Sequence, residues 1–217
     1  MGSSYNKQGL KILIAFQELD ARKAKFIELY NKVLKDRPNG IYSVDLVAIG
    51  SIDRSVHIGA GLKILVDRFN MLCSRILLRS QIDTVLRFFS IFLVDQPTAF
   101  ALQILNGVRI NLLEDSSGNR LTDSYLVSRI KREQPWIPDL YRTLSNYVHF
   151  SNQHIFGTIQ EIDEGIVTAG IYEEDVNQPE INWLEVVECY NKISDVLISF
   201  IERWLIMREE LNNKRGR

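Results

Sequence analysis

The sequence predicts an all-α fold, a helical bundle with a small β-hairpin inserted near residues 155–172. Apolar residues recur at three- and four-residue steps through most of the 217 positions, a spacing typical of amphipathic helices. The chain has only 5 prolines and 12 glycines, which disfavours a fold built on many tight turns. Near Ile155 the apolar spacing changes from that of a helix to that of a strand. We therefore expect one helical domain, 1–217, that carries a single hairpin.

A long amphipathic helix is expected within residues 5–38, where charged residues separate the apolar positions. The turn signal Pro38-Asn39-Gly40 ends it. A second helix is expected at 43–69, although glycines in its middle lower its helix propensity. These glycines either permit close contact with another helix or divide the segment in two. They are Gly50, Gly59 and Gly61.

The segment 69–94 is apolar almost all round, which is typical of a helix at the centre of a bundle. Charged residues at four-residue steps nevertheless form a single row along it. We call this row the arginine stripe: Arg75, Arg79, Asp83 and Arg87. A buried, unpaired arginine is costly, so the stripe needs either protein partners or a solvent-filled cleft.

Shorter helices are expected in the middle of the chain. Proline at the first position suits a helix at 97–106, and residues 114–119 have the composition of a loop. Thr122 or Asp123 caps the helix that follows this loop. A further helix is expected at 139–151, and it carries the motif described below.

The hairpin is expected from two short strands, 155–159 and 166–172, joined by a turn at 163–165 that contains glycine. Residues 157–180 contain seven acidic side chains and no lysine or arginine. The whole insertion, which spans positions 155 to 179, is therefore expected to be a solvent-exposed acidic flap. A closing helix is expected at 180–213, because the apolar residues there return to helical spacing.

The balance of charges and the small number of cysteines narrow the function classes. Twenty-six basic and 27 acidic side chains give a formal charge of −1, which disfavours a globally basic nucleic-acid binder and an acidic disordered chain. Cys73 and Cys189 have no metal-ligand spacing and cannot form a disulfide framework, so free thiols in a reducing cytoplasm are expected. The sequence has no apolar run long enough for a membrane helix and none of the common nucleotide-binding or hydrolase motifs. We therefore expect a cytoplasmic protein that contacts no membrane and uses no metal or cofactor.

Three polar residues of the helix expected at 139–151 form the candidate site. Arg142 and His149 are seven positions apart, which is two helical turns, and Asn146 lies between them on the same face. A histidine titrates near neutral pH, so it can take a proton from a 2′-hydroxyl or give one to a leaving oxygen. An arginine can hold the phosphate, and an amide can orient either group. The set suits metal-independent cleavage of RNA phosphodiesters.

The run from Arg142 to His149 resembles the R-x(4–6)-H signature of the HEPN superfamily. The wider pattern, in which an arginine-rich central helix precedes the motif, is similar to bacterial HEPN-like proteins related to the abortive-infection protein AbiV. The resembling part spans roughly 60–155, within an expected HEPN-like core of 41–155. The chain departs from the commonest form of the motif at Thr143, because the residue after the arginine is often asparagine.

The superfamily includes metal-independent ribonucleases of toxin–antitoxin, abortive-infection and CRISPR-linked systems, in which two subunits usually pair their motifs into one site. The resemblance therefore implies an endoribonuclease of a prokaryotic defence or toxin system that acts on RNA as a homodimer. It also implies an antitoxin or another defence-system protein as a partner. In this interpretation His149 is the general acid/base, Arg142 binds phosphate and Asn146 positions them. The implied substrate-binding residues belong to the arginine stripe: Arg75, Arg79 and Asp83.

Two other interpretations are open from the sequence. His149 could be a buried histidine that bonds to Asp83 or Ser145 and locks two helices together, with Arg142 at the surface. The chain would then be a non-catalytic helical interaction module that uses the arginine stripe for packing or partner binding. It could also be a sensor that binds RNA or a nucleotide without turnover. An exposed cleft that unites the motif with the stripe favours the enzyme or the sensor, and an enclosed His149 favours the interaction module.

Overall fold

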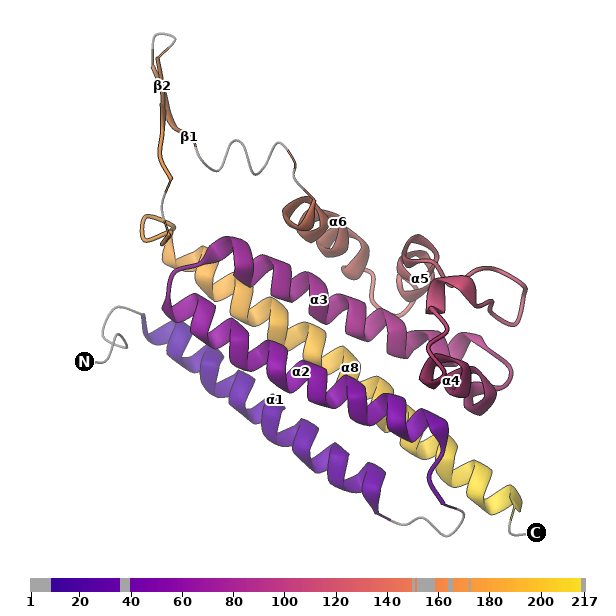
Figure 1. The fold of residues 1–217 in the computed structure, drawn as a ribbon. Coiled ribbons are helices and arrows are strands. Elements are labelled where there is room, and N and C mark those ends of the chain that lie inside the picture. The colour runs from indigo at the N-terminus through magenta and orange to yellow at the C-terminus, as the bar shows by residue number, and fades with distance from the viewer. Residues whose placement is uncertain are drawn as a thin grey trace.

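Four long helices form most of the described chain, which in this computed structural model comprises residues 9–35, 40–149, 151, 159–163, 166–171 and 173–215. They are α1 (Leu10–Leu34), α2 (Ser43–Asp67), α3 (Met71–Phe89) and α8 (Glu180–Arg215). Both α1 and α3 pack against α2 and against α8, so the four helices run side by side (Figure 1). The predicted helical bundle is confirmed.

α2 runs unbroken through its glycines, and Gly59 lies directly against α8. The Tyr190 hydroxyl of α8 donates a hydrogen bond to the carbonyl oxygen of Ser55, 2.7 Å away, on the surface of α2. A Cβ atom at position 59 would lie 2.6 Å from the Tyr190 hydroxyl oxygen. This glycine therefore permits the close approach of α2 and α8. The alternative that the glycines divide the helix is wrong.

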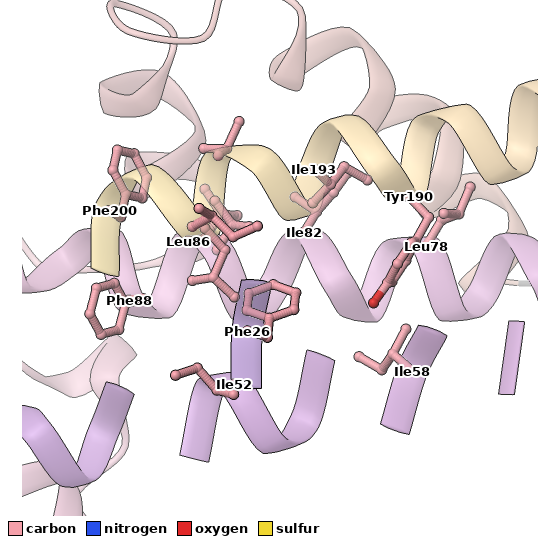
Figure 2. Packing of buried hydrophobic residues seen from close by; sticks show 14 of the residues in the cluster. Phe26, Ile52, Ile58, Leu78, Ile82, Leu86, Phe88, Tyr190, Ile193 and Phe200 are labelled. Atoms are coloured by element: carbon pink, nitrogen blue, oxygen red, sulfur yellow. The ribbon is translucent and has the colours of Figure 1, made fainter. Parts of the chain in front are cut away.

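Buried side chains from all four long helices meet around α3. Leu78, Ile82 and Leu86 of α3 are at most 2% exposed, and Figure 2 shows them close to the side chains of α8. Other buried residues in the same view come from α1, α2 and α8: Phe26, Ile52, Ile58, Ile193 and Phe200. The central position predicted for the apolar segment is confirmed, although α3 ends at Phe89 and continues as the 3-10 turn Ser90–Leu93.

A cluster of polar groups is buried where the start of α2 meets the second half of α8. The Asp45 carboxylate is fully buried and accepts hydrogen bonds from Trp204 Nε1 at 2.8 Å and from the Tyr42 backbone N–H at 2.9 Å. Arg208 Nη1 lies 3.5 Å from the same carboxylate and donates to the Val33 carbonyl oxygen at 2.9 Å. The buried charges are thus paired and bonded, which removes most of the cost of taking them out of water.

Shorter helices follow α3: α4 (Pro97–Leu105), α5 (Asp123–Ile130) and α6 (Ile137–Val148), with the 3-10 turn Ile110–Leu112 after α4. Thr122, and not Asp123, caps α5, because its hydroxyl oxygen accepts the Tyr125 backbone N–H at 3.3 Å. α6 begins and ends earlier than the predicted helix 139–151. Both α5 and α6 pack on α3.

Two strands pair in the region where the hairpin was expected. β1 (Ile159–Asp163) and β2 (Ile166–Ala169) are antiparallel, and in Figure 1 they lie apart from the helices. Asp163 belongs to β1, so the prediction that it is a turn residue is wrong. The rest of the predicted strand 155–159 and the turn residues 164–165 lie outside the described part of the chain.

Asp175 attaches the acidic segment that follows β2 to the bundle. Its carboxylate accepts the Met71 backbone N–H at 2.9 Å, and its own N–H donates to the Phe69 carbonyl oxygen at 2.7 Å. Phe69 has a φ of 51°, where the chain turns between α2 and α3. The expectation of a wholly solvent-exposed acidic flap is therefore wrong at Asp175, since this residue helps to hold the start of α3 in place.

Candidate functional site

α6 carries the predicted motif, and one of its faces is fixed against the bundle. Pro138 occupies the first turn, where its missing N–H costs no helical hydrogen bond, and the acidic Asp139 suits the positive end of the helix dipole. Ile137 and Leu144 are buried, and they join the hydrophobic core that α3 and α8 share. The apolar positions of the sequence therefore fix which side of α6 faces α3.

The motif residues lie at the surface of α6. Arg142 and Asp139 form an ion pair of 2.7 Å between Nη2 and Oδ1, and both side chains are 76% exposed. Asn146 is half-buried, and its carbonyl oxygen accepts the Ser151 hydroxyl at 2.8 Å. His149 is exposed and follows the last residue of the helix, with an extended backbone and its N–H bonded to the Ser145 carbonyl oxygen. The expected continuation of the helix to Ser151 is wrong.

The arginine stripe lies along the seam between α3 and α6. The Arg75 guanidinium lies 4.4 Å from the centre of the Tyr147 ring and donates to the Tyr147 hydroxyl. Arg79 is only 9% exposed, and its guanidinium lies 3.7 Å from the centre of the Tyr141 ring. Such cation–π contacts are strongest where water is excluded. Two arginines of the central helix thus stack on two tyrosines of the motif helix.

Carboxylates balance part of the positive charge in this seam. Arg79 forms an ion pair with Asp83, one turn further along α3, and Arg87 forms one with Asp123 at the start of α5. Tyr141 donates its hydroxyl to the Asp123 carboxylate at 3.4 Å. Burial raises the pKa of Tyr141, and the nearby carboxylates of Asp123 and Asp83 add to this effect, while the charge of Arg79 opposes it. The seam is a bonded polar network that joins α3, α5 and α6.

The predicted site residues therefore occupy two different surroundings. Arg75, Arg79 and Asp83 are brought together, and they bond mainly to protein groups in the seam. Arg142 is exposed on α6, and His149 is exposed directly after the last residue of that helix. Because His149 is exposed, the interpretation of a buried histidine that locks two helices is wrong. The catalytic and substrate-binding roles of these residues stay predictions.

The seam includes Tyr141, which sequence reasoning did not identify, and Ser145, which it considered only as a partner of His149. Tyr141 and Ser145 are four positions apart, as are Arg75 and Arg79 on the facing helix. Ser145 accepts a hydrogen bond from Arg79 Nε at 3.1 Å. Two rows with the same helical spacing can lie against each other, so this match was a usable signal. The sequence alone did not show which of the two faces of the motif helix would meet the stripe.

Among the described residues, no group of histidine, cysteine and acidic side chains is placed to hold a metal ion. None of the described helices combines the length and the apolar composition that a membrane span requires. Comparison with known proteins gives no further identification: no family model matches the chain, and neither a curated protein nor a solved structure shows significant similarity to it. The HEPN resemblance therefore rests on the motif and the arginine-rich helix alone.

Proposed function

We propose that the protein is a metal-independent endoribonuclease in which α6 carries the reacting groups. One observation supports this more than any other: Arg142 is exposed on a helix whose other face is fixed by the seam with α3, and His149, also exposed, directly follows the last residue of that helix. An anchored helix keeps Arg142 in place, and the backbone bond from His149 N–H to the Ser145 carbonyl oxygen holds the chain at His149 close to the helix end, which suits the positioning that acid–base cleavage needs. Such an activity would suit a toxin of a prokaryotic defence system that is restrained by an antitoxin or a similar partner protein.

His149 takes part in proton transfer in this proposal. A base removes the proton of an RNA 2′-hydroxyl, and the oxygen attacks the adjacent phosphorus. The bond to the 5′-oxygen breaks, that oxygen takes a proton from an acid, and a 2′,3′-cyclic phosphate remains. Two proton-transfer groups are required, and a second copy of the chain would supply a second His149. His57 is not proposed as the second proton-transfer group of the same chain. It belongs to α2, whereas His149 follows α6, and it pairs with Asp53 on α2 at 3.6 Å.

Arg142 binds the scissile phosphate in this proposal. Its present partner, Asp139, is as exposed as Arg142 itself, and exposed ion pairs contribute only about 0–1 kcal/mol. A phosphate that makes a two-pronged, charge-assisted contact can therefore displace the Asp139 carboxylate. Asn146 lies one turn along α6 from Arg142, and in this proposal its amide orients the phosphate or the imidazole.

Arg75, Arg79 and Asp83 act as positioning residues here, because their bonds are made within the seam. Arg79 in particular is nearly buried and is already bonded to Ser145 and Asp83. Release of its guanidinium to a phosphate would leave the Asp83 charge without its partner. The stripe thus supports the proposed activity through the orientation of α6.

The experiment is cleavage of mixed structured and single-stranded RNAs in EDTA by the wild type, His149→Ala and His57→Ala. The last variant is a matched control, since it removes an exposed histidine from another helix. Circular dichroism first establishes that all three are folded. We expect cleavage by the wild type and His57→Ala and loss of at least about 100-fold in His149→Ala, the usual size of a general acid–base contribution. Equal cleavage by all three proteins would contradict the proposal.

A second candidate function is a non-catalytic interaction module, and an apolar groove favours it. The groove has a volume of about 750 Å³ and lies between the start of α2, α4 and the end of α8. Leu102 and Leu105 of α4 and Leu46 of α2 line it and are all more than 40% exposed. This function predicts a wild type that is dimeric but inactive on RNA, and a Leu102→Asp variant that is monomeric in analytical ultracentrifugation. A dimer that survives Leu102→Asp would contradict a role for the groove in self-association.

A further inference from the structure

A polar groove between α2 and α3 lies outside the motif on α6. Its volume is about 410 Å³, within the roughly 300–1,000 Å³ typical of small-ligand sites. Its lining consists of Val47, Gly50, Ser51 and Arg54 from α2 and Asp83, Thr84 and Arg87 from α3. Apart from Val47, these side chains are polar or absent. The lining therefore suits a charged ligand better than a hydrophobic one.

Arg54 presents hydrogen-bond donors to this groove. Its Nε donates to the Thr84 hydroxyl oxygen at 3.0 Å, which fixes the guanidinium beside α3. Within the described part of the chain, no carboxylate forms an ion pair with Arg54. The hydroxyls of Ser51 and Thr84 donate to carbonyl oxygens of their own helices, so they are not the main donors to a ligand. The Nη groups of Arg54 are the strongest donors on the α2 side.

Arg87 completes the cationic side of the groove. Its Nη2 forms the ion pair with Asp123, whereas its Nη1 is buried and has no hydrogen-bond partner within the described residues. The buried Nη1 is not an accessible donor, so Arg87 contributes its positive charge to the lining of the groove. The carboxylate that lines the groove, Asp83, is already paired with Arg79. The lining of the groove thus contains two arginines, Arg54 and Arg87, and one carboxylate, Asp83, so its formal charge is positive.

We propose that this groove binds a small anion that carries a phosphate group, held between Arg54 and Arg87. Planar guanidinium groups match the geometry of phosphate oxygens, so Arg54 supplies the hydrogen-bond donors from α2 while the charge of Arg87 attracts the anion from α3. The lining contains no aromatic side chain on which a base could stack. The groove therefore recognises the phosphate and not the group attached to it. This inference is independent of the proposed nuclease, because Arg142 and His149 do not line the groove.

The experiment is isothermal titration calorimetry at low salt with inorganic phosphate, adenosine monophosphate and a short RNA as separate probes. The variant Arg54→Gln removes the main donor, while Arg109→Gln removes the same charge from an exposed residue outside the groove. We expect phosphate to bind the wild type and Arg109→Gln with similar affinity and Arg54→Gln roughly tenfold more weakly or worse. Arg54→Lys keeps the charge but not the planar fork, so its affinity is expected to be intermediate.

A second variant tests the groove without the loss of a charge. A Cβ at Gly50 meets no atom within 4 Å, so Gly50→Leu is compatible with the fold and projects into the groove. It is expected to weaken phosphate binding, whereas Gly50→Ala leaves it nearly unchanged. The proposal is overturned if Arg54→Gln and Arg109→Gln lose affinity equally, if Gly50→Leu binds normally, or if no monophosphate binds the wild type. If the short RNA binds but neither inorganic phosphate nor adenosine monophosphate does, the proposal is also overturned, because the groove would then be part of an RNA-binding surface.

Discussion

The Arg79 guanidinium lies over the Tyr141 ring, with 3.7 Å between its central carbon and the ring centre. The same guanidinium pairs with Asp83 and donates to Ser145. One side chain of the central helix therefore makes a stacking contact, an ion pair and a hydrogen bond, two of them across the seam to α6. This convergence explains how a twelve-residue helix with few buried apolar residues keeps a defined orientation.

Arg79→Met is expected to destabilise the protein by about 2–3 kcal/mol, measured by urea unfolding. This is below the roughly 3–5 kcal/mol for breaking a fully buried pair, because the Asp83 side chain is 32% exposed. The control is Arg203→Met, which also removes a stacking contact, on Phe92, and an ion pair, with Glu133, but at a 48% exposed side chain. Its cost should stay under about 1 kcal/mol. Equal costs would mean that the seam contributes no more than a surface pair.

Asp139→Asn is expected to increase RNA affinity modestly, by about two- to fivefold. The substitution removes the carboxylate that competes with phosphate for Arg142, and an exposed pair is worth only about 0.2–1 kcal/mol. Arg142→Gln should have the opposite and larger effect. Fluorescence anisotropy with labelled RNA measures both. If Asp139→Asn weakens binding instead, Arg142 is not the phosphate contact.

Asp45→Ala is expected to cost about 3–5 kcal/mol, because it leaves the Arg208 charge buried without its carboxylate. It also removes the acceptor for Trp204 Nε1. Asp53→Ala, on the same helix, is the matched control: its side chain is 73% exposed, so the change should stay within about 0.5 kcal/mol. Chemical denaturation monitored by Trp fluorescence measures both variants. A small cost for Asp45→Ala would show that Arg208 can reach solvent.

Gly59→Ala and Gly50→Ala are expected to have opposite effects on the free energy of unfolding. The new methyl group at position 59 would lie 2.6 Å from the Tyr190 hydroxyl oxygen, and such overpacking costs about 1–3 kcal/mol. At position 50 it meets open space, so alanine should stabilise α2 by about 0.5–1 kcal/mol. Thermal unfolding distinguishes the two. A stabilising Gly59→Ala would mean that α2 and α8 separate easily.

The loop before α5 is expected to lose its order in acid. Burial raises the pKa of Asp115, but hydrogen bonds from the Tyr125 hydroxyl and from the N–H groups of Asn119 and Ser117 outweigh it, so the net pKa is lowered. A lowered carboxyl pKa stabilises the folded loop above the unfolded value of about 3.9 and loses that effect as the pH falls through the folded pKa. NMR of the Ser117 and Asn119 amides should show this transition, and Asp115→Asn should abolish it. Amide shifts that stay constant to pH 2 would contradict it.

The sequence predicted the bundle and most of its helices, because local signals mark them. Proline at position 97 and the Thr122 hydroxyl set helix starts without help from distant residues. The apolar segment around α3 also predicted its central position. These features depend on spacing and capping, which a single sequence displays directly.

The partners of polar residues were not predictable in the same way. Arg79 contacts Tyr141 and Ser145, two partners that its proposed role in phosphate binding did not predict. Trp204 and Arg208 lie one turn apart on α8, but their shared partner Asp45 is 159 and 163 positions away, and no local signal links it to them. The orientation of α6 and the groove at Arg54 depend on how whole helices pack. The spacing of a sequence shows which residues share one face of a helix, but not which face of another helix they will meet.

The position of α8 has a consequence for the synthesis of the protein. α1, α2 and α3 pack against one another where α2 meets its neighbours, but the parts of their apolar surfaces that α8 covers stay exposed until its core residues, as far as Trp204, have been made. At about 5–20 residues per second, the delay between α1 and that residue is on the order of ten seconds or more. The nascent chain is therefore exposed to aggregation during this interval, in which a chaperone that binds apolar helices can act.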